Sequence, residues 1–281
     1  MDNARPAEPP FDRSTEDVGN IVEVGHVNVG VPDQQLAMVF YVMGLGLTRD
    51  PCLRTGVDNA WINVGTSQFH LPVGPRAQIL RGVTGLVMPD LAALTARLEA
   101  VAPRLAGTAF SYAGDLEQVD VRCPWGNRIR VHAPDAHRFG RMRLGMPYVE
   151  LDITPGRAPA VARFYAEVLA SPARVASDAL GPFACVRSGI GTDLVFRETA
   201  RPLPPYDGHH VQITVADFSG VHRRLHARGL ITEESSQSQY RFQDIVDVDT
   251  GDVLTTIEHE VRSMRHPLYA RTLINREPTR P

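Results

Sequence analysis

Two segments of the sequence begin with a histidine that is followed seven residues later by an aspartate. They are HVNVGVPD, from His26 to Asp33, and HVQITVAD, from His210 to Asp217. Their apolar residues are spaced as in a strand that ends in a turn, and a helical pattern follows each segment. Imidazole binds zinc, iron, nickel and related ions, and it also transfers protons near neutral pH. The repeated pattern therefore suggests metal or acid–base chemistry at equivalent strand positions.

The remaining histidines carry weaker signals. His209 precedes His210 and is expected on the opposite face of the strand, as a structural residue. His222 and His226 lie four residues apart on an arginine-rich helical segment, for which a solvated face is expected. The same structural interpretation applies to His132, His137 and His266.

The elements that must position these histidines recur four times along the chain. Each unit opens with a strand, continues through a helix and closes with hairpin strands, so it has the order βαβββ. Phe40-Tyr41 in the first helix matches Phe164-Tyr165 in the third. The four units, called modules here, are expected at residues 20–75, 76–138, 144–200 and 207–262.

A single module is too small to bury both a helix stripe and a sheet face, so the modules should pair. The sequence therefore predicts an α+β protein with curved mixed sheets. By chain order we expect a first domain at 20–138 and a second at 144–262. An irregular arm (1–19) and a C-terminal tail (263–281) flank them.

Composition excludes several function classes. The 29 basic residues are scattered and the net charge is -3, so nucleic acid is not expected as a ligand. No apolar run has the length of a membrane span, and the N-terminus lacks an apolar signal core, so we expect a cytoplasmic protein. Three cysteines without a CxxC are expected to be reduced and structural. The motifs GxSxG, GxGxxG and the P-loop are absent.

Four tandem βαβββ modules, the two strands that open with histidine, and the Gly126-Asn127 turn before a last strand together resemble the vicinal-oxygen-chelate superfamily. The resemblance covers about residues 20 to 260. It implies that two paired modules complete one divalent metal site, with ligands near the start of each first strand and on each last strand. It also implies two glyoxalase-like domains.

Carried over residue by residue, the resemblance implies the metal ligands His26, His70, His210 and Glu258. Glu258 is also the implied catalytic base. The last position stays open, because an extended turn at DVDTG resets the strand register, and His259 and Glu260 compete with Glu258.

The equivalent positions in modules two and three are Val83, Arg130, Glu150 and Phe196, which do not make a metal site. Pairing module one with module four therefore collects all the ligands and is favoured. Pairing three with four would instead give a site of Glu150, His210 and Glu258. An ion pair between Glu150 and Arg130 is the modest expectation for that pair.

The resemblance implies an enzyme that uses one divalent metal (Fe, Mn, Zn, Ni or Co) and chelates a small-molecule substrate through adjacent oxygens. Dioxygenase, isomerase and lyase chemistry all fit. The alternative is a metal-free protein that sequesters a small molecule, as bleomycin-resistance proteins do. No membrane partner is expected, and a homodimer is compatible with the module count.

Overall fold

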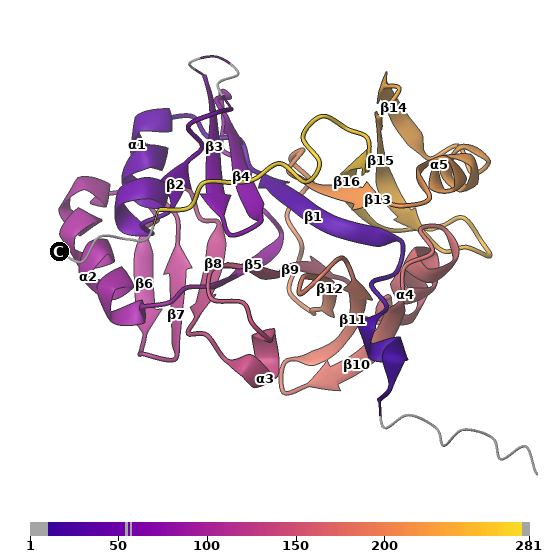
Figure 1. Ribbon diagram of the computed structural model, residues 1–281, viewed down its shortest axis with the longest axis horizontal. Coiled ribbons are helices and arrows are strands. Elements are labelled where there is room, and N and C mark those ends of the chain that lie inside the picture. The colour runs from indigo at the N-terminus through magenta and orange to yellow at the C-terminus, as the bar shows by residue number, and fades with distance from the viewer. Residues whose placement is uncertain (1–10, 54–55, 57, 277–281) are drawn as a thin grey trace, which may run out of the picture.

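Four units of one strand, one helix and three further strands follow one another in the computed structural model (Figure 1). The structure describes residues 11–53, 56 and 58–276. The part of the predicted arm that falls within them contains a short helix, η1 (Arg13–Glu16). The first ten residues of that arm and residues 277–281 of the predicted tail lie outside the described residues.

The four modules have the predicted element order. Module one contains β1 (Ile21–Asn28), α1 (Gln34–Met38), η2 (Val39–Gly44), β2 (Thr48–Arg49), β3 (Asn59–Val64) and β4 (Ser67–Pro72). Module two contains β5 (Gly82–Val87), α2 (Leu91–Val101), η3 (Ala102–Leu105), β6 (Ser111–Gly114), β7 (Gln118–Arg122) and β8 (Arg128–His132), followed by the connecting helix α3 (Ala136–Phe139). Module three contains β9 (Gly145–Ile153), α4 (Ala158–Glu167), β10 (Ala173–Asp178), β11 (Gly181–Arg187) and β12 (Asp193–Glu198). Module four contains β13 (His210–Val215), α5 (Phe218–His226), β14 (Ile231–Ser236), β15 (Gln239–Val246) and β16 (Val253–Ser263).

In modules one, two and four, the aspartate that closes the opening segment caps the following helix. The side chains of Asp33, Asp90 and Asp217 accept hydrogen bonds from backbone N–H groups in the first helical turn. Such a cap satisfies a backbone donor that the helix itself leaves free. The seven-residue spacing therefore has a structural meaning. In both segments the histidine lies on the opening strand, and the aspartate is the N-cap of the helix that follows.

The modules combine into two eight-stranded sheets. One sheet has the order β14-β15-β16-β13-β1-β4-β3-β2 and so joins module one to module four. The other has the order β10-β11-β12-β9-β5-β8-β7-β6 and joins modules two and three. Each sheet thus draws strands from both halves of the sequence, and we call them the outer-module sheet and the inner-module sheet. The sequence analysis favoured pairing module one with module four, because that pairing collects the implied ligands, and this is the pairing observed.

Aromatic pairs in the helices anchor the core. Phe40, Tyr41, Phe164 and Tyr165 are all fully buried, in η2 and α4. The Tyr165 hydroxyl lies 2.6 Å from Nε2 of His259 on β16, so the helix of module three packs against the sheet that contains module four. The two sheets and their helices therefore share one core.

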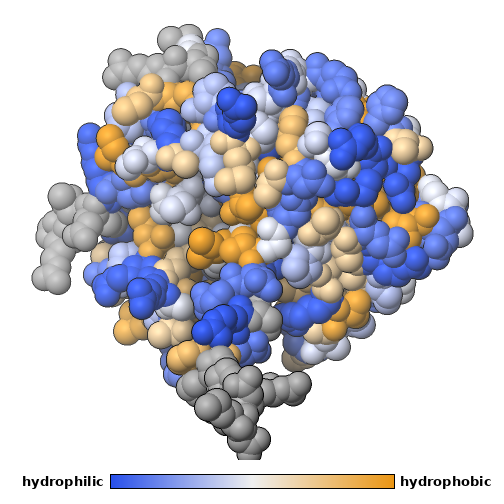
Figure 2. Space-filling view, turned by 45° about the vertical axis from the view of Figure 1, so that its right-hand side comes forward, coloured by the Kyte–Doolittle hydropathy of each residue, from blue (hydrophilic) through white to orange (hydrophobic). Residues whose placement is uncertain are grey.

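The surface mixes residue types. On the face seen in Figure 2, hydrophobic residues gather in small groups among hydrophilic ones. Exposed large apolar side chains, such as Leu116, Leu180 and Ile190, come from separate elements. Among the residues that the structure describes, no helix is both long and apolar enough to cross a bilayer.

Candidate metal centre

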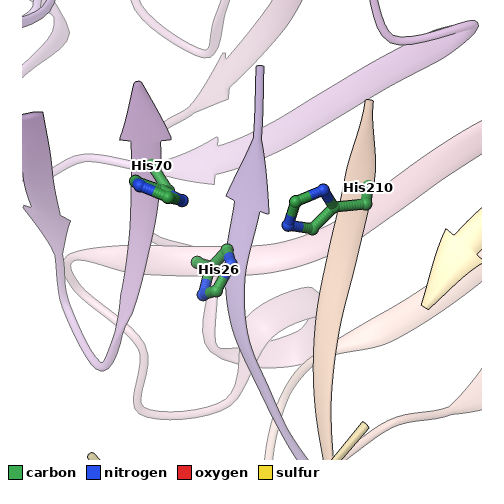
Figure 3. A group of neighbouring side chains, drawn as sticks. All are labelled: His26, His70 and His210. Carbon is green, nitrogen blue, oxygen red and sulfur yellow. The ribbon is translucent and has the colours of Figure 1, made fainter. Parts of the chain in front are cut away.

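Three histidines converge on one face of the outer-module sheet. His26 lies on the central strand β1, and His70 and His210 lie on its two neighbours, β4 and β13 (Figure 3). Both neighbours pair with β1 at Asn28, which is two residues from His26 and on the same face. One nitrogen atom from each ring lies within 4.8 Å of the other two. This separation suits three ligands around one small cation.

The free ring nitrogens of this cluster are unsatisfied. His26 Nε2, His70 Nδ1 and His210 Nε2 are buried and have no hydrogen-bond partner among the described residues. Buried polar atoms normally have partners, so three orphans in one cluster call for an explanation. A bound divalent cation would account for all three, and the donor set fits zinc, iron, nickel and related ions.

The other nitrogens of two of the rings are held in place. His70 Nε2 lies 2.6 Å from the amide oxygen of Asn59, and the ring stacks on Trp61 at 3.8 Å. His210 Nδ1 lies 3.3 Å from Oε1 of Glu258. Metal-bound histidines commonly donate their second N–H to such an acceptor, which fixes the ring orientation. Trp61 is therefore a wall of the site.

All three rings are kept neutral. Burial, and next to it the charge of Arg262, lowers the pKa of His26 well below its ordinary value. Burial is also the main cause that lowers the pKa of His70 to about 3 and that of His210 to about 2, with Arg241 contributing to both. Only the neutral form of imidazole binds a metal, so the rings are ready for binding without losing a proton.

The carboxylates next to the cluster are Glu258 and Glu260, both on β16. Arg241 on β15 forms ion pairs with both of them, and its Nη2 lies 2.7 Å from Oε2 of Glu260. Gln243 also donates to Glu258, at 3.2 Å. The two carboxylates therefore lie next to different nitrogens of His210. Glu258 contacts Nδ1, whereas Oε2 of Glu260 lies 3.7 Å from the free Nε2.

The strand register relates these positions by an approximate two-fold axis. His26 faces Gln212 and Asn28 faces His210 across the β1–β13 pair, so His26 and His210 are equivalent. On the last strands, His70 is opposite Asn28, and Glu260 is opposite Gln212. The equivalent of His70 is therefore Glu260, and Glu258 corresponds to Gln68.

The third competitor for the last position, His259, points to the other face of the sheet. It is fully buried, stacks on Phe242 at 4.4 Å, and its Nδ1 lies 2.9 Å from the backbone oxygen of Ile257. With Tyr165 at its Nε2, both ring nitrogens are engaged. Alternation of side chains along β16 explains why it cannot reach the histidine cluster.

A cavity of about 610 Å³ opens beside His26. The sheet contributes polar residues to it, including Glu23, Gln68 and Arg262. The C-terminal tail supplies the opposite wall, with Leu268, Ala270 and the segment 271–275. A mixed polar and apolar enclosure next to a metal centre is the usual form of a small-molecule site.

The tail is fastened to the edge of the same sheet. Arg271 Nη2 lies 2.6 Å from Oδ2 of the buried Asp50, and Asn63 donates to the backbone oxygen of Ile274 at 2.9 Å. Asn275 exchanges two hydrogen bonds with the backbone of Gly65, at 2.8 and 3.0 Å. In Figure 1 this yellow segment runs across β3 and β4, and its residues line the cavity.

Among the residues that the structure describes, the equivalent face of the inner-module sheet has no histidine cluster. Glu150 pairs with Arg197 at 2.9 Å, and Arg130 pairs with Asp120 at 2.7 Å. The expected Glu150–Arg130 ion pair is therefore wrong: each residue has a nearer partner of opposite charge on an adjacent strand. Val83 lies opposite Glu150 and offers no ligand atom.

Phe196, the last of the four positions inferred for modules two and three, is fully buried against Tyr165. It therefore lies on the core side of β12, not on the face that carries Glu150. The strand register assigns Val195 to that face, opposite Glu150.

Sequence reasoning missed the supporting residues. Asn59, Arg241 and Gln243 had no motif, because they act through strand pairing with segments far along the chain. Glu23 is three residues before His26, and ideal alternation would put it on the opposite face. Only the measured register shows otherwise.

No family model matches the chain, and no curated protein matches it. Solved structures do. A candidate dioxygenase of Bacillus subtilis aligns with a TM-score of 0.59 and 16% identity, over 88% of this chain and 86% of its own. Glyoxalase I from Zea mays aligns with a TM-score of 0.58 and 13% identity, over 86% and 92%. The cppA protein of Streptococcus pneumoniae aligns at 0.50 and 10%, over 87% and 99%. At these identities the likeness concerns the fold.

Proposed function

The chain has the vicinal-oxygen-chelate fold, and from this premise we propose that it is a metal-dependent enzyme acting on a small molecule with two adjacent oxygens. The observation that carries the proposal is the set of three neighbouring histidines, each of which has a buried ring nitrogen without a hydrogen-bond partner among the described residues. Dioxygenase, isomerase and lyase reactions remain within this class. Glyoxalase I and a candidate dioxygenase among the structural neighbours support that range.

We propose His26, His70 and His210 as metal ligands. The fourth ligand in this proposal is Glu260, because it is the two-fold equivalent of His70 and faces the free nitrogen of His210. Glu258, inferred from the sequence as ligand and base, stays a prediction, and its contact with His210 Nδ1 favours an orienting role.

The bound ion, one of Fe, Mn, Zn, Ni or Co, would act as a Lewis acid on the two substrate oxygens. The chain itself contributes three further things. Burial keeps the imidazoles neutral, Asn59 and Glu258 orient two of them, and the tail segment 268–275 shields the cavity from bulk water. Arg241 holds Glu258 and Glu260 in place before any ion arrives.

Metal titration tests the proposal. Wild-type protein should bind one divalent ion per chain, and His26→Ala, His70→Ala and His210→Ala should each weaken binding by about 100-fold or more, the upper end of the effect of losing an orienting partner. His132→Ala is the matched control, since His132 is an equally buried histidine on the inner-module sheet. It should bind the ion as the wild type does.

Two further variants separate the carboxylates. Glu260→Gln should reduce affinity as strongly as a histidine variant, whereas Glu258→Gln should cost only about 10-fold. If none of the five ions binds the wild-type chain, the enzyme proposal fails and the sequestration alternative takes its place. The reverse order of the two glutamate variants would restore Glu258 as the ligand.

A further inference from the structure

Glu23 shares the face of His26 because β1 contains two bulges. The β1–β13 register shifts between Ile21 and Glu23 and again between Val24 and His26. As a result Glu23 lies opposite Thr214 and His26 lies opposite Gln212. Thr214 and Gln212 are two residues apart on a strand and share a face, so Glu23 and His26 do as well. Both line the cavity.

Gly25, between these two residues, leaves room for the carboxylate. A Cβ atom at Gly25 would lie 2.8 Å from Oε1 of Glu23 and 1.9 Å from Oε1 of Gln212. Any other residue would push both side chains out of their positions. The bulge and the glycine together direct Glu23 into the cavity.

Glu23 differs from the other carboxylates near the cluster. Glu258 and Glu260 are ion-paired with Arg241, and Glu260 also with Arg262 at 2.6 Å. Within the described part of the chain, no cation lies within ion-pair distance of Glu23. A carboxylate held by arginines is a poor proton acceptor, because the positive charge stabilises its ionised form. Glu23 experiences that effect more weakly, from Arg262 beyond ion-pair distance.

The charged and titratable groups that line the cavity with Glu23 are His26 from β1, Arg262 from β16 and Arg271 from the tail. The cavity residues of β4 and β13, Gln68 and Gln212, carry no charge. Burial raises the pKa of Glu23, and Arg262 opposes part of that rise. A raised pKa brings a carboxyl group closer to the value at which it exchanges protons efficiently near neutral pH.

We propose that Glu23 is the general acid–base residue of this cavity. The inference rests on the proposed function, since it requires a substrate whose two oxygens are held at the histidine centre. The Glu23 carboxylate takes the proton of one substrate hydroxyl, and the electron pair of the broken O–H bond stays on the substrate oxygen. The resulting neutral acid later returns that proton to the product, so the residue is regenerated.

The experiment uses protein loaded with Zn²⁺, which is colourless and redox-inactive, and 4-nitrocatechol as the probe. The probe has two adjacent hydroxyls, and its absorption spectrum reports how many of them are ionised. In the wild type the bound probe should be fully ionised at a lower pH than in Glu23→Gln and Glu23→Ala. We expect the transition to rise by about one pH unit, tenfold in proton affinity, in both variants.

Metal content is the second readout. Both Glu23 variants should keep one ion per chain, which separates loss of the proton acceptor from loss of the centre. Glu99→Gln, on the exposed face of α2, is the matched control and should titrate as the wild type. An unchanged transition in both Glu23 variants with full metal content overturns the assignment of Glu23 alone. A wild-type chain that takes up neither Zn²⁺ nor the other four ions overturns the proposed function and this inference with it.

Discussion

The two sheets are built from the same module and present faces of different character. The outer-module sheet gathers His26, His70 and His210 with free nitrogens. On the inner-module sheet, polar groups pair with one another, as in the Glu150–Arg197 pair and the 2.8 Å contact between Tyr148 and Nε2 of His132, and the unpartnered Nδ1 of His132 has no second histidine beside it among the described residues. The fold supplies equivalent positions twice, and the side chains decide which set is open to a ligand.

The register makes the comparison position by position. Where the outer-module sheet has His26, His70, His210 and Glu260, the inner-module sheet has Val83, Arg130, Tyr148 and Val195. The equivalent of His210 is therefore Tyr148, and the sequence inference of Glu150 at that position is wrong, because Glu150 corresponds to Gln212. The ring of Tyr148 also lies over Gly85, at whose place a Cβ would be 2.4 Å from the ring. The second face is thus filled by its own side chains.

The largest effect is expected when the buried Glu150–Arg197 ion pair of the inner-module face is broken. Arg197→Ala should lower the free energy of unfolding by about 3 kcal/mol, because it leaves the carboxylate of Glu150 buried without its cation. Urea denaturation measures the loss. Replacing both partners, with Arg197→Met and Glu150→Leu, should recover most of it, since no buried charge is then left unpaired, and Asp178, the other partner of Arg197, is exposed to water. A loss in the single variant below about 1 kcal/mol would contradict a mutually satisfied face.

On the outer-module sheet, His70 should make the free energy of unfolding depend on pH. In metal-free protein, the folded-state pKa of His70 is about 3, below the ordinary value of 6.5. The unfolded chain therefore binds this proton first as pH falls, so the contribution is present above pH 6.5 and is lost below it. Between pH 7 and pH 5 the loss is about 2 kcal/mol for this residue.

Urea unfolding across that pH range, with a chelator present, gives the measurement. His70→Ala should show a curve shallower by this amount than the wild type. Val24→Ala removes no titrating group and should displace the whole curve by a constant. Equal slopes in the wild type and His70→Ala would mean that the ring is not held neutral in the folded state.

The smallest effect is expected at the rim of the inner-module face. The Arg130–Asp120 pair is partly exposed, with 28% and 54% of the two side chains accessible. Arg130→Ala should therefore lower the free energy of unfolding by no more than about 0.5 kcal/mol, because water screens such pairs. Denaturation at low and high salt checks this, and the small difference should vanish in salt. A loss of unfolding free energy as large as that of Arg197→Ala would contradict the expected difference between exposed and buried ion pairs on this face.

Much of the fold follows from local sequence patterns. The four modules, the helix starts at Asp33, Asp90 and Asp217, and the resemblance to glyoxalase-like proteins were all visible in residue spacing. So was the preference for joining module one to module four, because only that pairing collects His26, His70 and His210 on one sheet. Local patterns succeed here because strand and helix periods repeat within each module.

The details of the site did not follow from the sequence, for an identifiable reason. Parity along a strand predicts faces only where no bulge intervenes, and β1 has two bulges between Ile21 and His26. The edge strands β10 and β14 are largely exposed, and their apolar residues do not alternate with polar ones as in a half-buried strand. The tail segment 268–275 has no periodicity, and its place depends on contacts with β2 and β3.

The pairing of β1 with β13 also bears on how the protein is synthesised. Until the last module leaves the ribosome, β1 has an unpaired edge on the side that β13 will occupy. Such an edge is a template for unwanted pairing with other chains. The nascent protein must therefore keep this strand apart from neighbouring chains for most of translation, and chaperone demand should be concentrated on its first module.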